Sequence, residues 1–153
     1  MANTFSQIYI HIVFAVKGRD NLLQKPWRDN VFKYITGIIN KKNHKSIIVN
    51  GEADHVHCFI GFNPSYALSD LVRDIKNNSS NYINNNRFVL GRFQWQEGYG
   101  AFSYSQSHID SVFKYIMNQE THHRKKSFKS EYCELLKKFN IEYDERYLFQ
   151  WID

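Results

Sequence analysis

Hydrophobic residues alternate along two segments of the chain in the way that predicts β-strands. In residues 8–17, one face of the strand would carry Ile8, Ile10, Ile12, Phe14 and Val16. The other face would carry Tyr9, His11, Val13 and Ala15, and because both faces are largely apolar we expect a central strand. Residues 54–60 alternate in the same way, with His55, His57 and Phe59 on one face and Val56, Cys58 and Ile60 on the other.

The spacing of apolar residues also predicts helices, at residues 24–42, 68–84, 108–126 and 130–139. Further strands are predicted at 46–49 and 101–105, with a strand or an extended loop at 88–95. The turn residues 50–53 favour a hairpin that joins the strand at 46–49 to the strand that carries His55 and His57. The tail, residues 141–153, is rich in aromatic residues, which indicates that it docks on the rest of the chain.

The predicted order of elements is β-α-β-β-α-β-β-α-α, and its first six elements match the split ferredoxin-like or RRM-like arrangement. We therefore expect an α+β fold in which helices pack on an antiparallel sheet and residues 54–60 form an inner strand. The helix at residues 108–126 would add a C-terminal helix that carries Tyr115. With 153 residues and no internal repeat, we expect residues 1–153 to form a single domain.

The distribution of charge along the chain indicates a negatively charged binding partner. The chain has a formal net charge of +5, and its basic excess lies in residues 1–51 and 99–138, on both sides of the histidine strand in sequence. Such a distribution suits a polyanion such as nucleic acid. Two cysteines indicate a reducing compartment, and the absence of a signal peptide or a long apolar run leads us to expect a cytoplasmic protein without a membrane anchor.

The strongest chemical signal is the pair His55 and His57. Two imidazoles on one face of a strand with an apolar back can hold one metal ion. The predicted helix at 108–126 supplies further candidates, because Tyr115 and Gln119 lie one turn apart on a stripe beside its apolar face. The Gln119 oxygen can complete a metal shell that the histidines begin, and the basic cluster at 122–126 could hold phosphates.

Two motifs together resemble those of a known family: His55-Val56-His57, and Tyr115-Ile116-Met117-Asn118-Gln119. The chain is similar to the single-tyrosine HUH transposases of small bacterial insertion sequences. Further stretches of the chain look like parts of that family, at residues 71–76, 95–103, 119–126 and 141–147. The resemblance covers nearly the whole chain, and the matched catalytic positions show no departure from the family pattern.

The resemblance implies a DNA transposase that cleaves and rejoins single-stranded DNA at the ends of a mobile element. It implies that Tyr115 is the nucleophile, which leaves a 5′-phosphotyrosine and a free 3′-OH, and that His55, His57 and Gln119 bind a divalent metal. Two imidazoles suit Mn, Co or Zn better than Mg, whereas the family pattern points to Mg or Mn. Because the Gln119 oxygen and phosphate oxygens favour hard ions, we expect Mg²⁺ or Mn²⁺.

The resemblance also implies partners. We expect single-stranded DNA with hairpin-containing element ends, and a homodimer in which the histidine pair of one subunit faces the tyrosine helix of the other. Candidate DNA contacts are Lys17, Arg19, Arg73, Lys76, Arg124 and Lys125, and Trp95 and Tyr99 could stack bases. His11 is expected to pack within the sheet.

Other readings of the sequence stay open. One is a domesticated relative, replication initiator or relaxase that acts on chromosomal or plasmid hairpins, although relaxase-like proteins usually present a third histidine ligand where this chain offers Gln119. Another is a non-catalytic module that binds single-stranded nucleic acid by stacking bases on its sheet, which leaves the histidines and Tyr115 unexplained. A structural metal site is the weakest reading, since such sites usually close with four Cys or His ligands.

Overall fold

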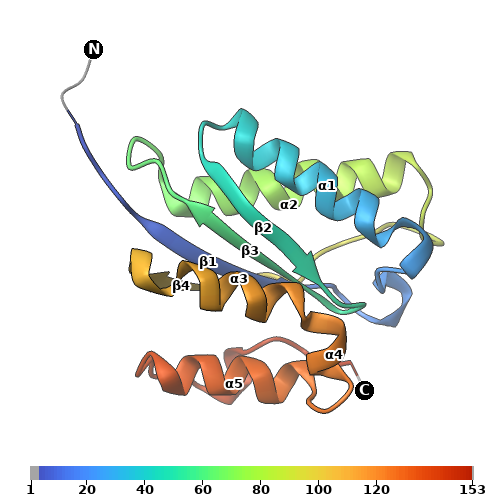
Figure 1. Cartoon of the computed structure of the whole chain (residues 1–153). Helices are drawn as coiled ribbons and strands as arrows, with labels where there is room; N and C mark the ends of the chain where they lie inside the picture. The colour runs from blue at the N-terminus through green and yellow to red at the C-terminus, as the bar shows by residue number, and fades with distance from the viewer. Residues whose placement is uncertain (1–3, 153) are drawn as a thin grey trace.

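A four-stranded antiparallel sheet organises the protein, and its strand order is β2-β3-β1-β4. The computed structural model describes residues 4–152 (Figure 1). Residues 1–3, which belong to the N-terminus where no signal peptide is expected, and residue 153 lie outside the described residues. The fold is therefore α+β, and the strand that carries the histidine pair lies inside the sheet, as the sequence predicted.

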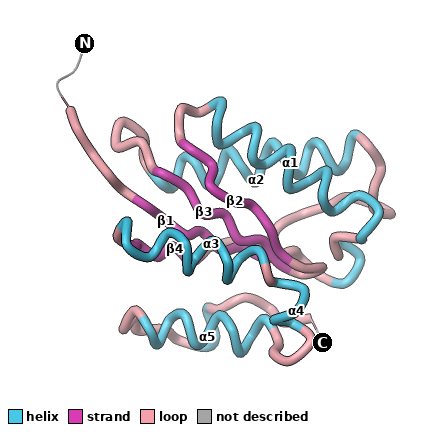
Figure 2. Tube along the Cα trace, in the orientation of Figure 1, coloured by secondary structure: helices cyan, strands magenta, loops and turns pink. Residues whose placement is uncertain are grey.

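The helices and strands follow the chain in the order that Figure 2 shows. The strands are β1 (Tyr9–Ala15), β2 (Lys45–Gly51), β3 (His55–Gly61) and β4 (Gly100–Tyr104). The helices are α1 (Lys25–Lys41), α2 (Leu68–Asn85), α3 (Ile109–Met117), α4 (Gln119–His123) and α5 (Phe128–Lys138). Short 3-10 turns precede α1, precede α3 and follow α5, at Arg19–Asn21, Gln106–His108 and Glu145–Tyr147.

The two faces of the sheet carry different layers. Helices α1 and α2 cover one face, and α3, α4 and α5 lie on the other side of the sheet (Figure 1). The alternation in β3 decides which side chain enters which layer, because Val56, Cys58 and Ile60 join the core beneath α1 and α2. Phe59 instead packs with Val112 and Ile116 of α3, so the histidines, which share its face, point into the α3–α5 layer.

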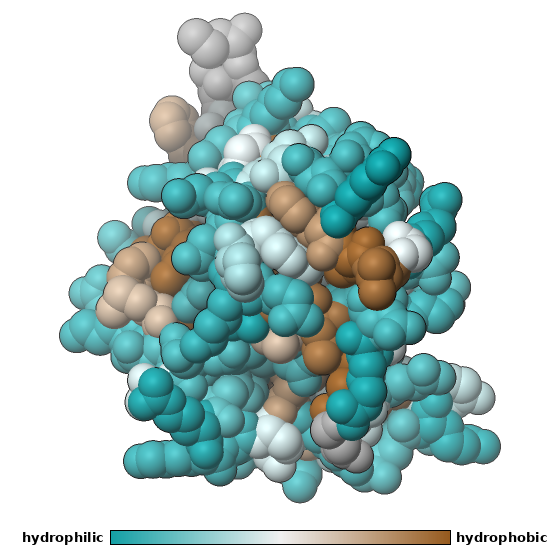
Figure 3. All heavy atoms as spheres, turned by 90° about the vertical axis from the view of Figure 1, so that its right-hand side faces the viewer, coloured by the Kyte–Doolittle hydropathy of each residue, from teal (hydrophilic) through white to brown (hydrophobic). Residues whose placement is uncertain are grey.

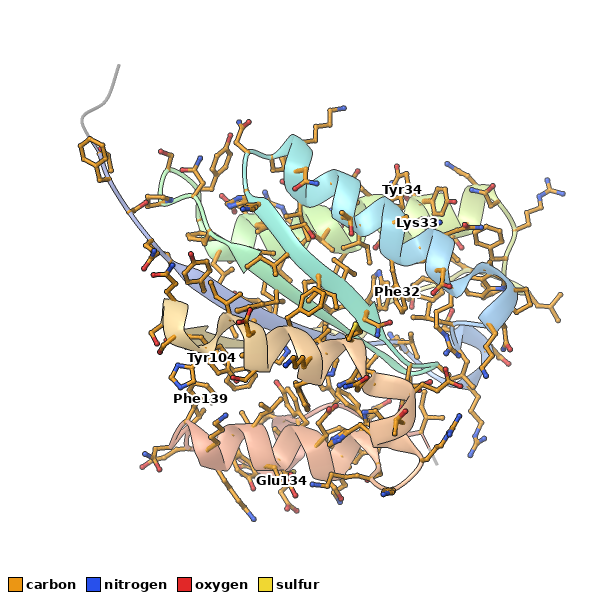
Figure 4. The ribbon with its side chains drawn as sticks, in the orientation of Figure 1. Phe32, Lys33, Tyr34, Tyr104, Glu134 and Phe139 are labelled. Atoms are coloured by element: carbon orange, nitrogen blue, oxygen red, sulfur yellow. The ribbon has the colours of Figure 1, made fainter. Side chains whose placement is uncertain are left out.

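A smaller core holds α5 and the C-terminal tail against the same face. It contains Val13, Phe102, Tyr132 and Phe149, and the partly buried Trp151 packs against it. The tail therefore docks, as its aromatic content predicted. Figure 4 shows Tyr104 and Phe139 pointing toward one another between the sheet side and α5, with their ring centroids 5.3 Å apart.

The prediction of one helix over residues 108–126 is wrong at Asn118. Helix α3 ends at Met117, and α4 begins at Gln119. The side chain of Asn50 in β2 donates hydrogen bonds to the carbonyl oxygens of Ile116 (2.9 Å) and Met117 (3.2 Å). Because a side chain from the sheet satisfies these carbonyls, the helix can end there. The cause lies far away in sequence, so the local pattern did not reveal it.

Residues 88–95, predicted as a strand or an extended loop, form an extended loop. Their one strand-like contact is an isolated antiparallel bridge between Val16 and Trp95. The expected second strand between α2 and α3 is therefore absent from the described part of the chain, where β4 is the one strand between these helices. No helix in residues 4–152 is both long and apolar enough to cross a membrane.

Candidate functional site

The candidate site lies where β3 faces α3, α4 and α5. His55 and His57 are two residues apart in β3, and both side chains are fully buried. Pairing of β3 with β1 places His55 beside Ala15 and His57 beside Val13, so both positions are fixed by a central ladder of the sheet. The alternation of the strand therefore delivers two imidazoles to one buried spot, as the sequence predicted.

His55 is held from both of its ring nitrogens. Its Nδ1 lies 2.7 Å from Asp54 Oδ1, and its Nε2 lies 3.0 Å from Gln119 Oε1. Its ring stacks on Phe128 of α5 at a centroid distance of 4.0 Å. Burial alone would lower the pKa of His55, but hydrogen bonds to Asp54 and Glu131 and the charges of these carboxylates raise it to about 9.

His57 and His11 form a second pair. His57 Nδ1 lies 2.7 Å from His11 Nε2, and His57 Nε2 lies 3.1 Å from Glu131 Oε1. A neutral His57 that donates from Nε2 to Glu131 must accept from His11 at Nδ1. Burial lowers the pKa of both histidines. His11 lies fully buried in the sheet, and it is also a direct neighbour of the site.

Glu131 of α5 lies at the centre of this cluster and was missed by the sequence analysis. Its Oε1 contacts His57, lies 3.4 Å from His55 Nε2 and accepts a hydrogen bond from His123 (3.0 Å). Its Oε2 accepts from the Tyr115 hydroxyl and from Gln119 Nε2. Burial alone would raise the pKa of Glu131, but the charge of His57 and hydrogen bonds from three histidines hold it well below the usual range.

A signal for Glu131 is present in the sequence. Phe128, Tyr132 and Leu135 are buried at helical spacing in α5, and Glu131 falls on the same stripe with 2% of its side chain exposed. A carboxylate on the apolar face of an amphipathic helix requires a polar partner in the core. The local pattern does not identify these partners, and one of them, His57, lies 74 positions away in the sequence.

Tyr115 of α3 reaches the same cluster from the side. Its ring lies edge-on to His57 with the centroids 5.8 Å apart, and its hydroxyl donates to Glu131. Burial and the neighbouring anion raise the pKa of Tyr115 above its usual value of 10. A single chain therefore brings Tyr115 and the histidine pair together. The side-by-side arrangement of Tyr115 and Gln119 survives the helix break, since both side chains contact Glu131.

Two cavities open onto Tyr115. One, of about 320 Å³, is lined by Tyr104, His122, Glu131 and Lys138 between α3 and α5. The other, of about 560 Å³, lies beside Asn118, His122, Lys125 and Lys126. The Nε2 atom of His122 is buried and has no hydrogen-bond partner among the described residues, although Glu131 Oε2 lies 3.5 Å away. The nucleophile candidate is therefore accessible from two sides, one of them basic.

The ligand atoms are arranged so that they could hold a divalent metal. One ligand atom each from His55, His57 and Glu131 lie within 4.8 Å of one another, and all three residues are buried. The donor set is two imidazole nitrogens and a carboxylate oxygen, with the Gln119 oxygen beside His55. Asp54 holds the other nitrogen of His55, which is the usual outer support of a metal-binding histidine. These residues fit a hard or borderline divalent ion.

The predicted DNA contacts lie in three separate places. Lys125 borders the basic cavity at Tyr115, and Arg19 and Arg124 border a cavity of about 490 Å³ that also contains Asp54 and His123. Lys17 and Arg73 border a third cavity, on the α2 side of the sheet. Lys76 borders it too, but its ammonium donates to the carbonyl oxygens of Gln96 (2.8 Å) and Gly98 (2.6 Å), so it holds a loop.

Comparisons with known proteins point to one family. The family model described as "Transposase IS200 like" matches residues 4–119. Among solved structures, a candidate transposase from Deinococcus radiodurans R1 has a TM-score of 0.61 and 19% identity, covering 78% of this chain and 95% of that one. A REP-associated tyrosine transposase bound to a REP hairpin has a TM-score of 0.59 and 13% identity, covering 80% and 73%. No curated protein matches the chain.

Proposed function

The chain belongs to the IS200-like transposase family, and from this premise we propose that it cleaves and rejoins single-stranded DNA through a covalent bond to Tyr115. The observation that carries the proposal is the convergence of Tyr115, His55, His57 and two side-chain oxygens, those of Gln119 and Glu131, at one buried spot with access from outside. A DNA-binding module has no use for this convergence, because such a module needs neither a buried ligand set nor a phenol beside it.

In the proposed reaction the Tyr115 oxygen attacks the scissile phosphorus. The bond between phosphorus and O3′ breaks, its electron pair stays on O3′, and O3′ takes up a proton to become a free 3′-OH. The phenolic proton is released to solvent, and the existing hydrogen bond from the Tyr115 hydroxyl to Glu131 orients the phenol for attack. The product is a 5′-phosphotyrosine, and a second 3′-OH can attack it, restore the phosphodiester and release Tyr115 without an external energy source.

We propose that His55, His57 and Glu131 bind a divalent ion, Mg²⁺ or Mn²⁺, with Gln119 as a further oxygen ligand. A bound ion would supply Lewis-acid polarisation of a phosphate oxygen. Among the chain's own residues, Asp54 orients the ring of His55, and His11 meets the ring of His57. An ion bound at His57 Nε2 would require the ring proton to be on Nδ1. His57 Nδ1 would then donate the hydrogen bond to His11 Nε2.

The substrate in this proposal is single-stranded DNA that contains a hairpin, such as the end of an insertion sequence. The neighbour bound to a REP hairpin supports a related candidate, in which this chain acts on palindromes dispersed in a chromosome. The homodimer predicted from the resemblance remains a proposal. Since one chain already brings its own Tyr115 and histidines together, a dimer is not required to assemble the candidate site.

An adduct assay tests the proposal. Single-stranded DNA from the flanks of the gene, including its imperfect palindromes, is incubated with the protein and Mg²⁺ or Mn²⁺ and run on denaturing gels. We expect a metal-dependent protein–DNA adduct that both Tyr115→Phe and His57→Ala abolish. Tyr147→Phe serves as a matched control, because Tyr147 is 81% exposed and lies outside the site.

The DNA sequences that form adducts distinguish the two candidate substrates. Adducts confined to sequences at element ends support a transposase of a mobile element, and adducts with dispersed palindromes support the chromosomal candidate. Tight DNA binding without any adduct, unchanged by Tyr115→Phe across several metals and substrates, would instead favour a non-catalytic binding protein.

A further inference from the structure

A polar cavity of about 540 Å³ lies between α2 and the loop of residues 88–99. It opens on the α2 side of the sheet, whereas Tyr115 lies on the α3 side. Its lining includes four basic side chains, those of Lys17, Arg73, Lys76 and Arg92, and one carboxylate, that of Glu97. A cavity with this charge attracts anions. Nothing in the proposed chemistry at Tyr115 uses it.

The loop that walls this cavity is held in place by side chains of α2. Asn84 Oδ1 accepts a hydrogen bond from the backbone N–H of Phe93 (2.7 Å), and Ser79 Oγ accepts from Trp95 Nε1 (3.0 Å). Lys76 donates to two carbonyl oxygens further along the loop. The loop has no helix or strand of its own, yet these bonds hold it along much of its length, so the chain's own hydrogen bonds fix the wall of the cavity.

The cavity offers both parts that a nucleotide needs. Tyr99 lines it with 36% of the residue exposed, and an exposed aromatic ring can stack a base. Arg73 and Arg92 lie exposed at the same cavity and can contact phosphates. Arg73 also pairs with Asp70 at 3.2 Å and with Asp74 at 3.7 Å, but with 62% of its side chain exposed these pairs are open to exchange with a phosphate.

The cavity lies within reach of the candidate metal site around the end of the sheet. Val16 of the central strand region bonds to Asp54 on one side, and its neighbours Ala15 and Lys17 bond to residues 94 and 96 on the other. Two strand spacings therefore separate His55 from the loop, about 10 Å in all. The turn after β1 bridges this interval, because Lys17 lines this cavity and Arg19 lines the one beside Asp54 and His123.

The surface at this end of the molecule is mainly hydrophilic (Figure 3). Figure 3 faces the right-hand end of Figure 1, where the turn after β1 and the start of α1 lie, and shows mainly hydrophilic residues with smaller hydrophobic patches between them. A polyanion that crosses this end would meet Arg124, which pairs with Glu120 at the surface, and then Arg19 and Lys17 before it reaches the cavity. The carboxylates of Glu52 and Asp54 line the same passage.

We propose that the cavity between α2 and residues 88–99 binds a nucleotide of the single-stranded DNA that extends away from Tyr115, with a base on Tyr99 and phosphates on Arg73 and Arg92. The proposal rests on the proposed function, since the bound strand is the one that Tyr115 attacks. It also reassigns Lys76, which holds the wall of the cavity in place and does not contact the phosphates.

Binding measurements in the Tyr115→Phe protein test this proposal without covalent chemistry. The probe is a fluorescent oligothymidine of about twelve nucleotides, a length that spans the site of a typical single-strand binder. We expect Tyr99→Ala to weaken binding about fivefold or more, and Tyr99→Phe to bind within about twofold, because the phenylalanine ring still stacks. Arg92→Ala should weaken binding and reduce its dependence on salt concentration.

Lys33→Ala is the matched control, since it removes one exposed positive charge from α1, away from the cavity (Figure 4). It should leave binding within about twofold. Equal losses for Lys33→Ala and Arg92→Ala, or unchanged binding by Tyr99→Ala, would overturn the proposal. Thymidine monophosphate is the third test. If it binds as tightly as the oligonucleotide, and Tyr99→Ala abolishes that binding, the cavity serves a free nucleotide and the proposal is wrong.

The failure of this proposal differs from the failure of the proposed function. If the wild-type protein forms the tyrosine adduct and Tyr99→Ala binds DNA normally, the proposed role of the cavity is wrong and the proposed function stands. Protein that never forms an adduct, but loses DNA binding in Tyr99→Ala and not in Lys33→Ala, supports the cavity and removes the catalytic role of Tyr115.

Discussion

The Glu131 carboxylate lies beside Tyr115, Gln119 and four histidines, which is an unusual number of polar neighbours for one buried side chain. Each oxygen faces a different part of the site. Oε1 faces His55, His57 and His123, and Oε2 faces Tyr115, Gln119 and His122. A buried anion of this kind depends on its partners, because an unpaired buried charge is strongly destabilising. Glu131 lies beyond residues 4–119, the part that the family model matches, so it is a feature of this chain that the family match does not explain.

Replacement of Glu131 by glutamine tests its assignment as a metal ligand. We expect Glu131→Gln to weaken Mn²⁺ binding at least about tenfold, because the neutral amide is a weaker ligand than the carboxylate and no longer compensates the charge of the ion. Isothermal titration of the metal-free protein with Mn²⁺ measures the effect. Glu134→Gln is the control, since Glu134 is an exposed residue of the same helix that pairs with Lys126 (Figure 4). Equal Mn²⁺ affinity of Glu131→Gln and wild type would remove Glu131 from the ligand set.

His55 gives the metal-free protein a particular dependence on pH. Its folded-state pKa is raised from 6.5 to about 9, so the stabilisation is complete below pH 6.5 and disappears as the pH rises through about 9. We expect the free energy of unfolding to fall by up to about 3 kcal/mol across that interval. The pKa values of His11 and His57 are lowered, so these histidines change the free energy of unfolding only at a pH below about 6.5. They therefore do not contribute to this fall.

Urea unfolding in the presence of a chelator measures this pH dependence. His55→Gln should lose this fall, because it keeps a hydrogen-bonding side chain and loses the titrating ring. Burial lowers the pKa of Lys76 to about 8, so the variant should instead gain stability slightly as the pH rises above about 8. A fall of equal size in His55→Gln would assign the pH dependence to another group.

In the β2–β3 hairpin, Gly51 leaves no space for a side chain. A Cβ atom on Gly51 would overlap the carbonyl oxygen of His55 and lie 3.0 Å from Val56 Cα. Both neighbours are backbone atoms of the strand that presents the metal ligands, so they can give way only if His55 moves. Glycine at this position is therefore required by the close approach of the two strands.

We expect Gly51→Ala to lower the free energy of unfolding by about 1–3 kcal/mol and to weaken Mn²⁺ binding as well. Gly61→Ala is the matched control at the other end of β3, where the added Cβ would lie 3.5 Å from Lys45 Cβ, an ordinary contact. Chemical denaturation and Mn²⁺ titration of both variants provide the measurements. If Gly51→Ala matches Gly61→Ala in both, the close approach does not constrain the site.

The elements also show where local sequence patterns stop being informative. The alternation in β1 and β3 placed their side chains on the correct faces, because the period of a strand depends only on the backbone. The same kind of reasoning continued the helix past Asn118, because the propensities of residues 118–123 do not reveal that Asn50 meets the end of α3. The helix boundary was decided by a contact between elements.

For the molecule as a whole, the C-terminal tail ties the two sides of the site together. Phe149 packs on Tyr132 and Phe128, and Phe128 stacks on His55. Gln150 exchanges backbone hydrogen bonds with the Gln96 side chain, which also bonds to Val16. The tail therefore connects α5 to the loop that walls the α2-side cavity. We propose from this connection that residues 1–153 form a single cooperative domain.

Truncation of Phe149 tests this coupling. We expect Phe149→Ala to lower the free energy of unfolding by about 3–5 kcal/mol, because Phe149 is buried within an aromatic cluster. Mn²⁺ binding should weaken too, since Phe128 loses support beside His55. Tyr147→Ala, which removes an exposed ring of the same tail, should change stability by less than about 0.5 kcal/mol. Separate unfolding transitions in wild-type protein, seen by tryptophan fluorescence and circular dichroism, would contradict a single domain.

The sequence by itself determined the features that depend on local periodicity. It predicted the α+β class, the inner position of the histidine strand and the shared strand face of His55 and His57, because alternation along a strand is a property of neighbouring residues. It also led to the family through short motifs at fixed positions.

Tertiary structure alone decided what surrounds those histidines. Glu131 joined the site because α5 packs against the histidine face of β3, and the ammonium of Lys76, a proposed DNA contact, bonds to two carbonyl oxygens of the loop. Hydrogen bonds and ion pairs between buried groups depend on which elements meet in space. No repeating pattern in the sequence specifies a meeting of residues more than seventy positions apart.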